Sequence, residues 1–137
     1  MYEGIVITGT SGSGKSAIGR AMCQRDARFG LTPALTTRGT CADDQPGEYK
    51  YCSDEEFDNF ARNKELLMGT TYRGQRYGIL VSDYQAIVAH SKIPILILTP
   101  DAALALEAGV QGRQGKPQKP LPLFLSLFLD ASDKVLD

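Results

Sequence analysis

The sequence predicts an α/β protein in which helices cover both faces of a parallel sheet. Short unbroken runs of aliphatic and β-branched residues, typical of buried strands, recur at residues 5–8, 93–98 and 123–129. Segments whose apolar residues have helical spacing lie between these runs, at residues 16–26, 53–64, 81–90 and 101–108. Such alternation is typical of parallel strands joined by crossover helices.

The composition indicates one ordinary globular domain. The chain has 137 residues, 42% of them hydrophobic and 23% charged. Fifteen Lys and Arg against 16 Asp and Glu give a net charge of -1, so we expect neither nucleic acid nor a membrane surface as a partner. Three cysteines without CxxC spacing and a single histidine favour a reduced, cytoplasmic setting without a metal cluster. No apolar run is long enough for a membrane span, and the oligomeric state stays open.

Local signals define the elements between these runs. The helix at 53–64 begins with Ser53 as a predicted N-cap and Glu56 at the capping-box position. Residues 68–79 suggest a twisted hairpin, and residues 111–120 a polar connector. The side chains expected to face inward from the first three helices are Ala17, Ile18, Ala21, Met22, Phe57, Phe60, Ala61, Tyr84, Ile87 and Val88.

The strongest chemical signal is GTSGSGKS at residues 9–16, which fits GxxxxGK[ST] between a predicted strand and a predicted helix. In such a P-loop the backbone N–H groups and the helix N-terminus surround phosphate oxygens. Lys15 should reach the β- and γ-phosphates of ATP, and the Ser16 hydroxyl should bind Mg²⁺. The alternative is a glycine-rich turn without a ligand. The residues predicted to bind the nucleotide are Gly9, Ser11, Gly12, Ser13, Gly14, Lys15 and Ser16.

Further motifs narrow the function, because a P-loop alone leaves kinase, hydrolase and switch open. TTR at 36–38, GEY at 47–49, the acidic helix start at 53 and RYG at 76–78 follow in the order and spacing of the guanylate kinase family, which the chain resembles from residue 5 to about 137. The resemblance implies a P-loop NTPase-type sheet with a small inserted acceptor-binding subdomain, at about residues 34–80. It also implies transfer of the γ-phosphoryl group of ATP to a nucleoside monophosphate or another small phosphorylated acceptor.

The resemblance assigns the acceptor phosphate to Arg38, Tyr49, Tyr77 and Gly78, and makes Arg38 a catalytic residue beside Lys15. The side-chain chemistry agrees: a guanidinium can hold a phosphate with two parallel hydrogen bonds, and phenols donate hydrogen bonds without adding charge. Each residue also has a structural alternative. Arg38 could be a solvated surface residue, and either tyrosine could lie at the edge of the core.

Some positions depart from the family pattern. Cys41 replaces a second phosphate-binding arginine, for which Arg73 or Arg76 could substitute. Met68 and Ile79 stand where the family has a glutamate and a serine that recognise guanine. Neither side chain accepts hydrogen bonds from guanine N–H groups, and each unpaired buried donor costs about 1 to 3 kcal/mol. The sequence therefore predicts weak selectivity for GMP.

The carboxylate expected near Mg²⁺ and the last residues of the sequence also differ from the family pattern. Asp101 is the nearest candidate carboxylate for Mg²⁺, although an acid in the first turn of a helix explains it better. Residues 130–137 match the start of the family's arginine-bearing lid, so a chain that ended there is expected to be a poor catalyst. We therefore predict an ATP-dependent kinase. The alternatives are a non-catalytic guanylate kinase-like module that binds a nucleotide or a protein, and a P-loop hydrolase or switch.

Overall fold

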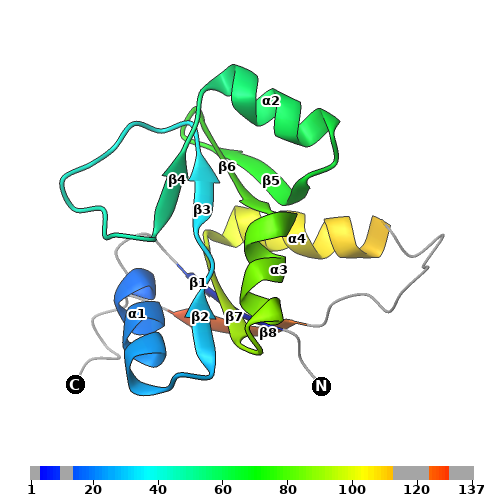
Figure 1. Ribbon diagram of the computed structural model, residues 1–137. Helices are drawn as coiled ribbons and strands as arrows, with labels where there is room; N and C mark the ends of the chain where they lie inside the picture. Colours follow the sequence, from blue (N-terminus) through cyan, green and yellow to red (C-terminus); the bar gives the residue numbers. More distant parts are fainter. Residues whose placement is uncertain (1–3, 10–13, 113–123, 130–137) are drawn as a thin grey trace.

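The computed structural model describes residues 4–9, 14–112 and 124–129, which form two sheets with helices around them (Figure 1). The first sheet has the strand order β2-β7-β1-β8, and all of its pairings are parallel. Its strands are β1 (Gly4–Gly9), β2 (Phe29–Leu31), β7 (Ile93–Leu98) and β8 (Phe124–Leu129). The predicted α/β class is confirmed.

Helix α1 (Lys15–Arg25) covers one face of this sheet. Its Gly19 is buried against β7, and a Cβ added there would lie 2.7 Å from Ile97 Cδ1 and 3.6 Å from Ile95 Cγ2. Only a residue without a side chain allows the helix to approach the strand this closely. The glycine therefore sets the distance between the P-loop helix and the sheet.

Helices α3 (Val81–Ala89) and α4 (Pro100–Gly112) cover the opposite face. Because side chains alternate along a strand, Leu96 and Leu98 of β7 point away from α1. They join the main core cluster, whose buried members are Val6, Leu67, Met68, Tyr84, Ile79, Leu96, Leu98, Ala102 and Leu106. This cluster contains residues from both sheets, so α4 packs between them.

The second sheet has the strand order β4-β3-β6-β5. It consists of β3 (Ala34–Thr36), β4 (Tyr49–Tyr51), β5 (Leu66–Tyr72) and β6 (Gln75–Leu80). Strands β5 and β6 form an antiparallel hairpin whose turn residues, Arg73 and Gly74, both have positive φ values, 52° and 77°. Two positive φ angles are typical of the tight turns that match strand twist, and they confirm the predicted hairpin.

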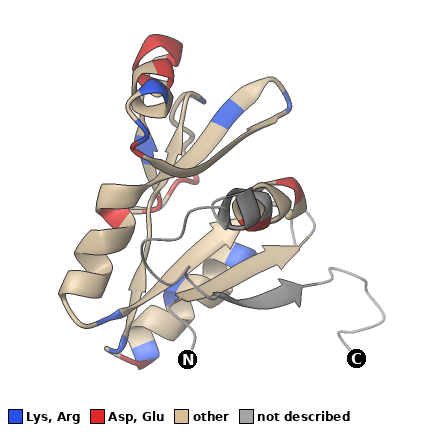
Figure 2. Ribbon diagram, turned by 90° about the vertical axis from the view of Figure 1, so that its right-hand side faces the viewer, with Lys and Arg blue, Asp and Glu red and all other residues tan. Residues whose placement is uncertain are grey.

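Helix α2 (Asp54–Arg62) packs on the outer face of the second sheet through the buried ring of Phe57. Ser53 Oγ accepts a hydrogen bond from Glu56 N at 3.0 Å, and Ser53 N donates to Glu56 Oε1 at 2.9 Å. This reciprocal pair is the predicted capping box. The acidic residues of the first turn stand out in red on α2 in Figure 2, at the helix end where negative charge is favourable.

Some inward-facing predictions are wrong. Val88 is 47% exposed, Ile18 is 39% exposed, and Ala61 is also exposed. Each of these helices contacts its sheet along a narrow stripe, which on α3 runs through the buried Tyr84.

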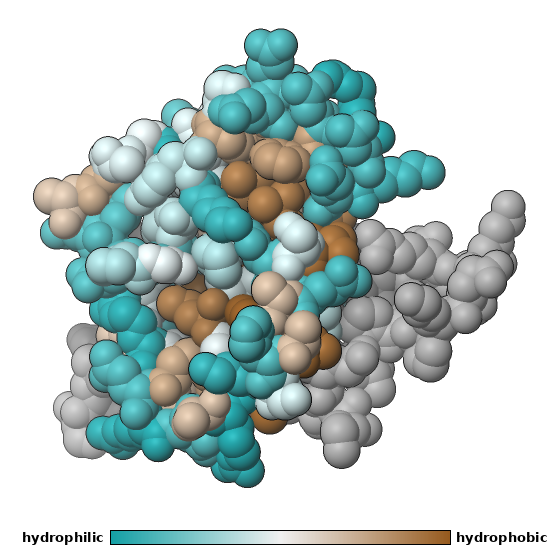
Figure 3. Space-filling view, viewed as in Figure 1, coloured by the Kyte–Doolittle hydropathy of each residue, from teal (hydrophilic) through white to brown (hydrophobic). Residues whose placement is uncertain are grey.

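Figure 3 shows apolar residues interspersed with polar ones over the face seen in Figure 1. Among the described residues, no helix has the length and apolar character needed to cross a membrane.

The extent of helix α4 and the presence of strand β2 also differ from the sequence-based expectation. Helix α4 begins at Pro100 and continues to Gly112, so it includes the first residues of the predicted connector at 111–120. Residues 113–120 of that connector lie outside the described part of the chain, as do residues 130–137. Strand β2 was not predicted, because its three residues, Phe29–Leu31, include a glycine and are too few to show a period.

Candidate functional site

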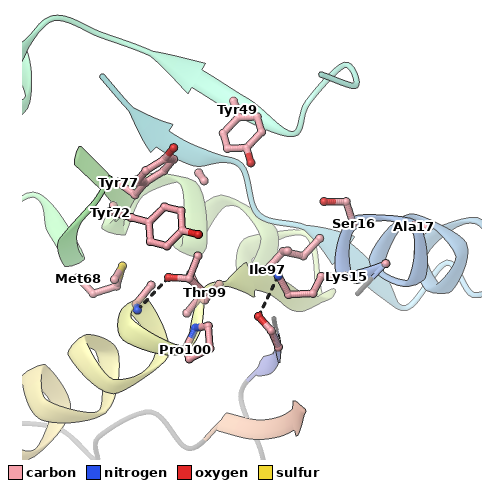
Figure 4. Close-up of a pocket in the computed structure, with 16 residues that line it drawn as sticks. Lys15, Ser16, Ala17, Tyr49, Met68, Tyr72, Tyr77, Ile97, Thr99 and Pro100 are labelled. Atoms are coloured by element: carbon pink, nitrogen blue, oxygen red, sulfur yellow. Dashed lines mark hydrogen bonds between the residues drawn. The ribbon is translucent and has the colours of Figure 1, made fainter. Parts of the chain in front are cut away.

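A cavity of about 390 Å³ lies between the carboxyl end of the parallel sheet and the second sheet (Figure 4). The P-loop side contributes Gly9, Gly14, Lys15 and Ser16. The second sheet contributes Ala34, Tyr49, Met68, Tyr72, Tyr77 and Gly78. One cavity thus brings together most of the residues predicted to hold the two substrates.

The P-loop end of the cavity is built around the start of α1. Gly14 has φ +88°, and an added Cβ would meet nothing within 4 Å, so glycine is needed there for its conformation and not for space. Lys15 Nζ donates a hydrogen bond to Gly9 O at 3.0 Å, and partial burial lowers the pKa of Lys15. Ser11, Gly12 and Ser13 lie outside the described residues. A cation beside a helix N-terminus makes this end suited to an anion.

The opposite wall carries phenol side chains. Met68 and Tyr72 are four positions apart on β5, so they point to the same face. Tyr77 of β6 pairs with Thr70, and its ring centroid lies 6.4 Å from that of Tyr72. In Figure 4 these rings and Tyr49 border the space above Thr99. No role was predicted for Tyr72, although its period-two spacing from Met68 indicates that it faces the cavity.

Arg38 does not line this cavity but contacts a residue that does. Its guanidinium carbon lies 4.7 Å from the centroid of the Tyr49 ring. The same group donates to Asp44 Oδ1 at 3.1 Å and to Gly39 O at 3.0 Å. Partial burial lowers the pKa of Arg38, but hydrogen bonding and charge from Asp44 outweigh it, so the net shift is upward. Arg38 is therefore held behind Tyr49 with its charge paired to a carboxylate.

Thr36 holds the backbone at this point. It is fully buried, and its Oγ1 accepts from Arg38 N at 3.1 Å while donating to Arg76 O at 3.0 Å. These bonds join β3 to β6 immediately before Arg38. The sequence predicts no role for Thr36, because a β-branched residue in a strand has an ordinary explanation.

Within the described part of the chain, no second arginine reaches the cavity in place of Cys41. Arg76 pairs with the carboxylate of Asp58, and the guanidinium of Arg73 lies 5.1 Å from the Tyr72 ring centroid on the hairpin turn. Neither arginine is among the lining residues. Neither Arg73 nor Arg76, the two substitutes that the sequence offered, therefore contributes to the described cavity wall.

The described lining also contains no carboxylate. Met68 lines the cavity and is 6% exposed, whereas Ile79 belongs to the core and does not reach it. Asp101 is exposed in the first turn of α4, where Thr99 Oγ1 accepts from Ala102 N at 3.2 Å and caps the helix. No group of three or more His, Cys, Asp or Glu able to hold a metal occurs among the described residues. A metal ion here would depend on hydroxyl and phosphate oxygens.

Comparisons with known proteins agree with this arrangement. A family model described as Guanylate kinase matches residues 1–110. The chain is 28% identical over 124 residues to the guanylate kinase of Mycoplasmopsis synoviae (strain 53), a match that covers 89% of this chain and 63% of that protein. It is 32% identical over 115 residues to the guanylate kinase of Thermosynechococcus vestitus, covering 83% of this chain and 57% of that protein.

The fold has a close counterpart among solved structures. The crystal structure of guanylate kinase from Anaplasma phagocytophilum superposes with a TM-score of 0.66 at 15% identity, over 94% of this chain and 60% of that one. The chain thus spans less than two thirds of the length of these relatives. The family model covers most of the 137 residues, and the fold agrees with it. The chain belongs to the guanylate kinase family.

Proposed function

We propose that this chain carries out ATP-dependent phosphoryl transfer to a nucleoside monophosphate. The observation that carries the proposal is that Lys15 and Ser16 of the P-loop line the same cavity as Tyr49 and Tyr77 of the second sheet. Two substrates bound at opposite ends of one cavity can be aligned for direct transfer, which is the main requirement of phosphoryl-transfer catalysis. The relatives reported above are named as kinases, which supports an enzyme over a binding module.

The donor end would hold ATP. Lys15 would contact the β- and γ-phosphates, and backbone N–H groups of residues 9–16 would surround them. The Ser16 hydroxyl, at the cavity wall, is the kind of hard oxygen ligand that Mg²⁺ accepts together with phosphate oxygens. When bound, Mg²⁺ neutralises charge that develops on the transferring group.

The acceptor end would hold the monophosphate. Tyr49 and Tyr77 donate to its phosphate. A Cβ at Gly78 would lie 2.8 Å from Met68 O and 3.2 Å from the Phe57 ring, so glycine is needed there for β6 to pack against β5 and α2. Arg38 reaches the phosphate only by giving up Asp44, which now occupies its guanidinium. Exchange of one anion for another keeps the arginine paired, because the acceptor phosphate replaces its existing partner. Asp44 would keep the hydrogen bonds that it accepts from the Tyr51 hydroxyl and from Cys41 N.

The relatives' names make GMP the first acceptor to test. The described lining offers phenols and apolar groups but no carboxylate to accept from guanine N–H groups. We therefore expect other nucleoside monophosphates to compete with GMP more effectively than in an enzyme with a glutamate at position 68.

The test is a coupled ADP-release assay with Mg-ATP against a panel of nucleoside monophosphates. Lys15→Ala and Arg38→Ala should each lower acceptor-stimulated turnover by about a hundredfold or more. Arg28→Ala is the matched control, because the Arg28 side chain is exposed and, among the described residues, pairs with Asp26 at the end of α1. ATP binding without stimulation by any acceptor would refute the proposal in favour of a binding module, and phosphate release without acceptor would favour a hydrolase.

A further inference from the structure

A second, smaller cavity adjoins the P-loop end of the main one. Its volume is about 20 Å³, close to the space that one water molecule needs. Ser16 and Tyr49 line both cavities, so the two meet at the start of α1. The smaller cavity is also lined by Thr32 and Glu48, which the proposed function does not use.

Thr32 presents an unpaired polar group at this position. The residue is 3% exposed, and its Oγ1 has no hydrogen-bond partner. A buried hydroxyl without a partner is unfavourable, and the few found in native proteins call for an explanation such as an ordered water or an ion. An oxygen ligand inside the small cavity would satisfy it.

Glu48 brings a carboxylate to the same place. Its side chain is only 12% exposed, and Oε2 lies 3.9 Å from Arg20 Nη1. Arg20 follows Ser16 by one helical turn, so both lie on the same face of α1, and the carboxylate lies over that face. Oε1 accepts from Gln45 N at 3.1 Å. An ionised carboxylate has about four acceptor positions, so these two contacts leave capacity for a water molecule.

Asp101, the candidate carboxylate for Mg²⁺ from the sequence, does not reach the small cavity. Asp101 is exposed in the first turn of α4 and lines neither cavity. The carboxylate in the small cavity comes instead from Glu48, directly before β4. This segment is far in sequence from the end of β7, which Asp101 follows. Glu48 and Ser16 line the same small cavity, which favours Glu48 over Asp101.

We propose that Glu48, together with Thr32, orients the water shell of the Mg²⁺ that accompanies the bound nucleotide. The inference rests on the proposed function. Mg²⁺ dehydrates reluctantly and usually keeps several waters, so a carboxylate can act on it through water without direct ligation. Partners of this kind typically change metal affinity by about 10- to 100-fold when they are removed.

The test separates metal binding from turnover. Affinity for a non-hydrolysable ATP analogue is measured by calorimetry with and without Mg²⁺, for the wild-type chain, Glu48→Gln and Asp101→Asn. Glu48→Gln should keep the metal-free affinity within about twofold and lose about tenfold of the Mg²⁺-dependent gain. Asp101→Asn should match the wild type. Electron paramagnetic resonance of Mn²⁺ with the protein–analogue complex should show the same loss of metal affinity in Glu48→Gln.

Each other outcome overturns the inference in a recognisable way. An unchanged Mg²⁺ gain in Glu48→Gln, or a loss in Asp101→Asn, would mean that the acid is misassigned. Equal loss of metal-free and metal-bound affinity, with a lowered melting temperature, would give Glu48 a structural role through Arg20. Failure of the wild-type chain to bind the analogue at all would overturn the proposed function as well.

Discussion

Thr36 offers a direct test of how the second sheet holds Arg38. Thr36→Val keeps the shape of the side chain but removes the hydroxyl, which makes two hydrogen bonds, to Arg38 N and to Arg76 O. Arg76 O retains a bond from Thr37 N at 3.1 Å, whereas Arg38 N loses its side-chain acceptor. At about 1 kcal/mol for each hydrogen bond, the free energy of unfolding should fall by about 2 kcal/mol.

The assay is equilibrium unfolding in urea, with Thr36→Ser as the control. The serine keeps the hydroxyl and loses one buried methyl group, which costs about 0.8 kcal/mol. In the kinase assay, Thr36→Val should raise the KM for the acceptor more than Thr36→Ser, because only the valine releases the backbone before Arg38. A valine variant as stable as the wild type, beside a weakened serine variant, would show that methyl packing matters and would refute the hydrogen-bond argument.

Three further predictions concern the same sheet. Gly78→Ala should cost about 1 to 3 kcal/mol in thermal unfolding, because the new Cβ would lie 2.8 Å from the Met68 backbone oxygen. Gly69→Ala, whose nearest neighbour is at 3.4 Å, should be clearly milder, and equal losses would contradict this explanation. Met68→Glu should lower the KM for GMP relative to UMP by about tenfold, with Met68→Gln as the uncharged control; an unchanged ratio would separate Met68 from base recognition. The hydrogen bond to Asp44 raises the pKa of Tyr51 to about 12, so its stabilising effect is present below the unfolded pKa of about 10 and disappears as pH rises through 12. Phenolate absorbance should show this late titration, and Asp44→Ala should move it to lower pH.

Features that depend on residues close in the chain were predictable. The P-loop sequence pattern stands between β1 and α1, and both elements follow from residues that are neighbours in the chain. The capping box at Ser53 and the hairpin at 66–80 are local for the same reason. Strand β2 was missed because Phe29–Leu31 is too short to show a period, and its position is set by pairing with β7.

Side-chain direction was less predictable. Val88 and Ala61 have the helical spacing of core residues, but each helix contacts its sheet through a stripe narrower than its apolar face. Helical periodicity states which residues share a face and leaves open how much of that face the neighbouring element covers. The same limit applies to the tyrosines, whose part in a cavity depends on the distance between two sheets.

The sequence by itself determined the α/β class and the family, and it supplied the P-loop pattern, because these follow from local patterns and from motifs in a given order. Only the tertiary structure decided that Arg38 lies behind Tyr49 with Asp44 as its partner, that Arg73 and Arg76 do not line the cavity, and that Glu48 lies over the helix face of Ser16. These relations join residues whose separation in space is set by strand pairing and helix packing. The order of residues along the chain does not state how far apart two such residues lie in space.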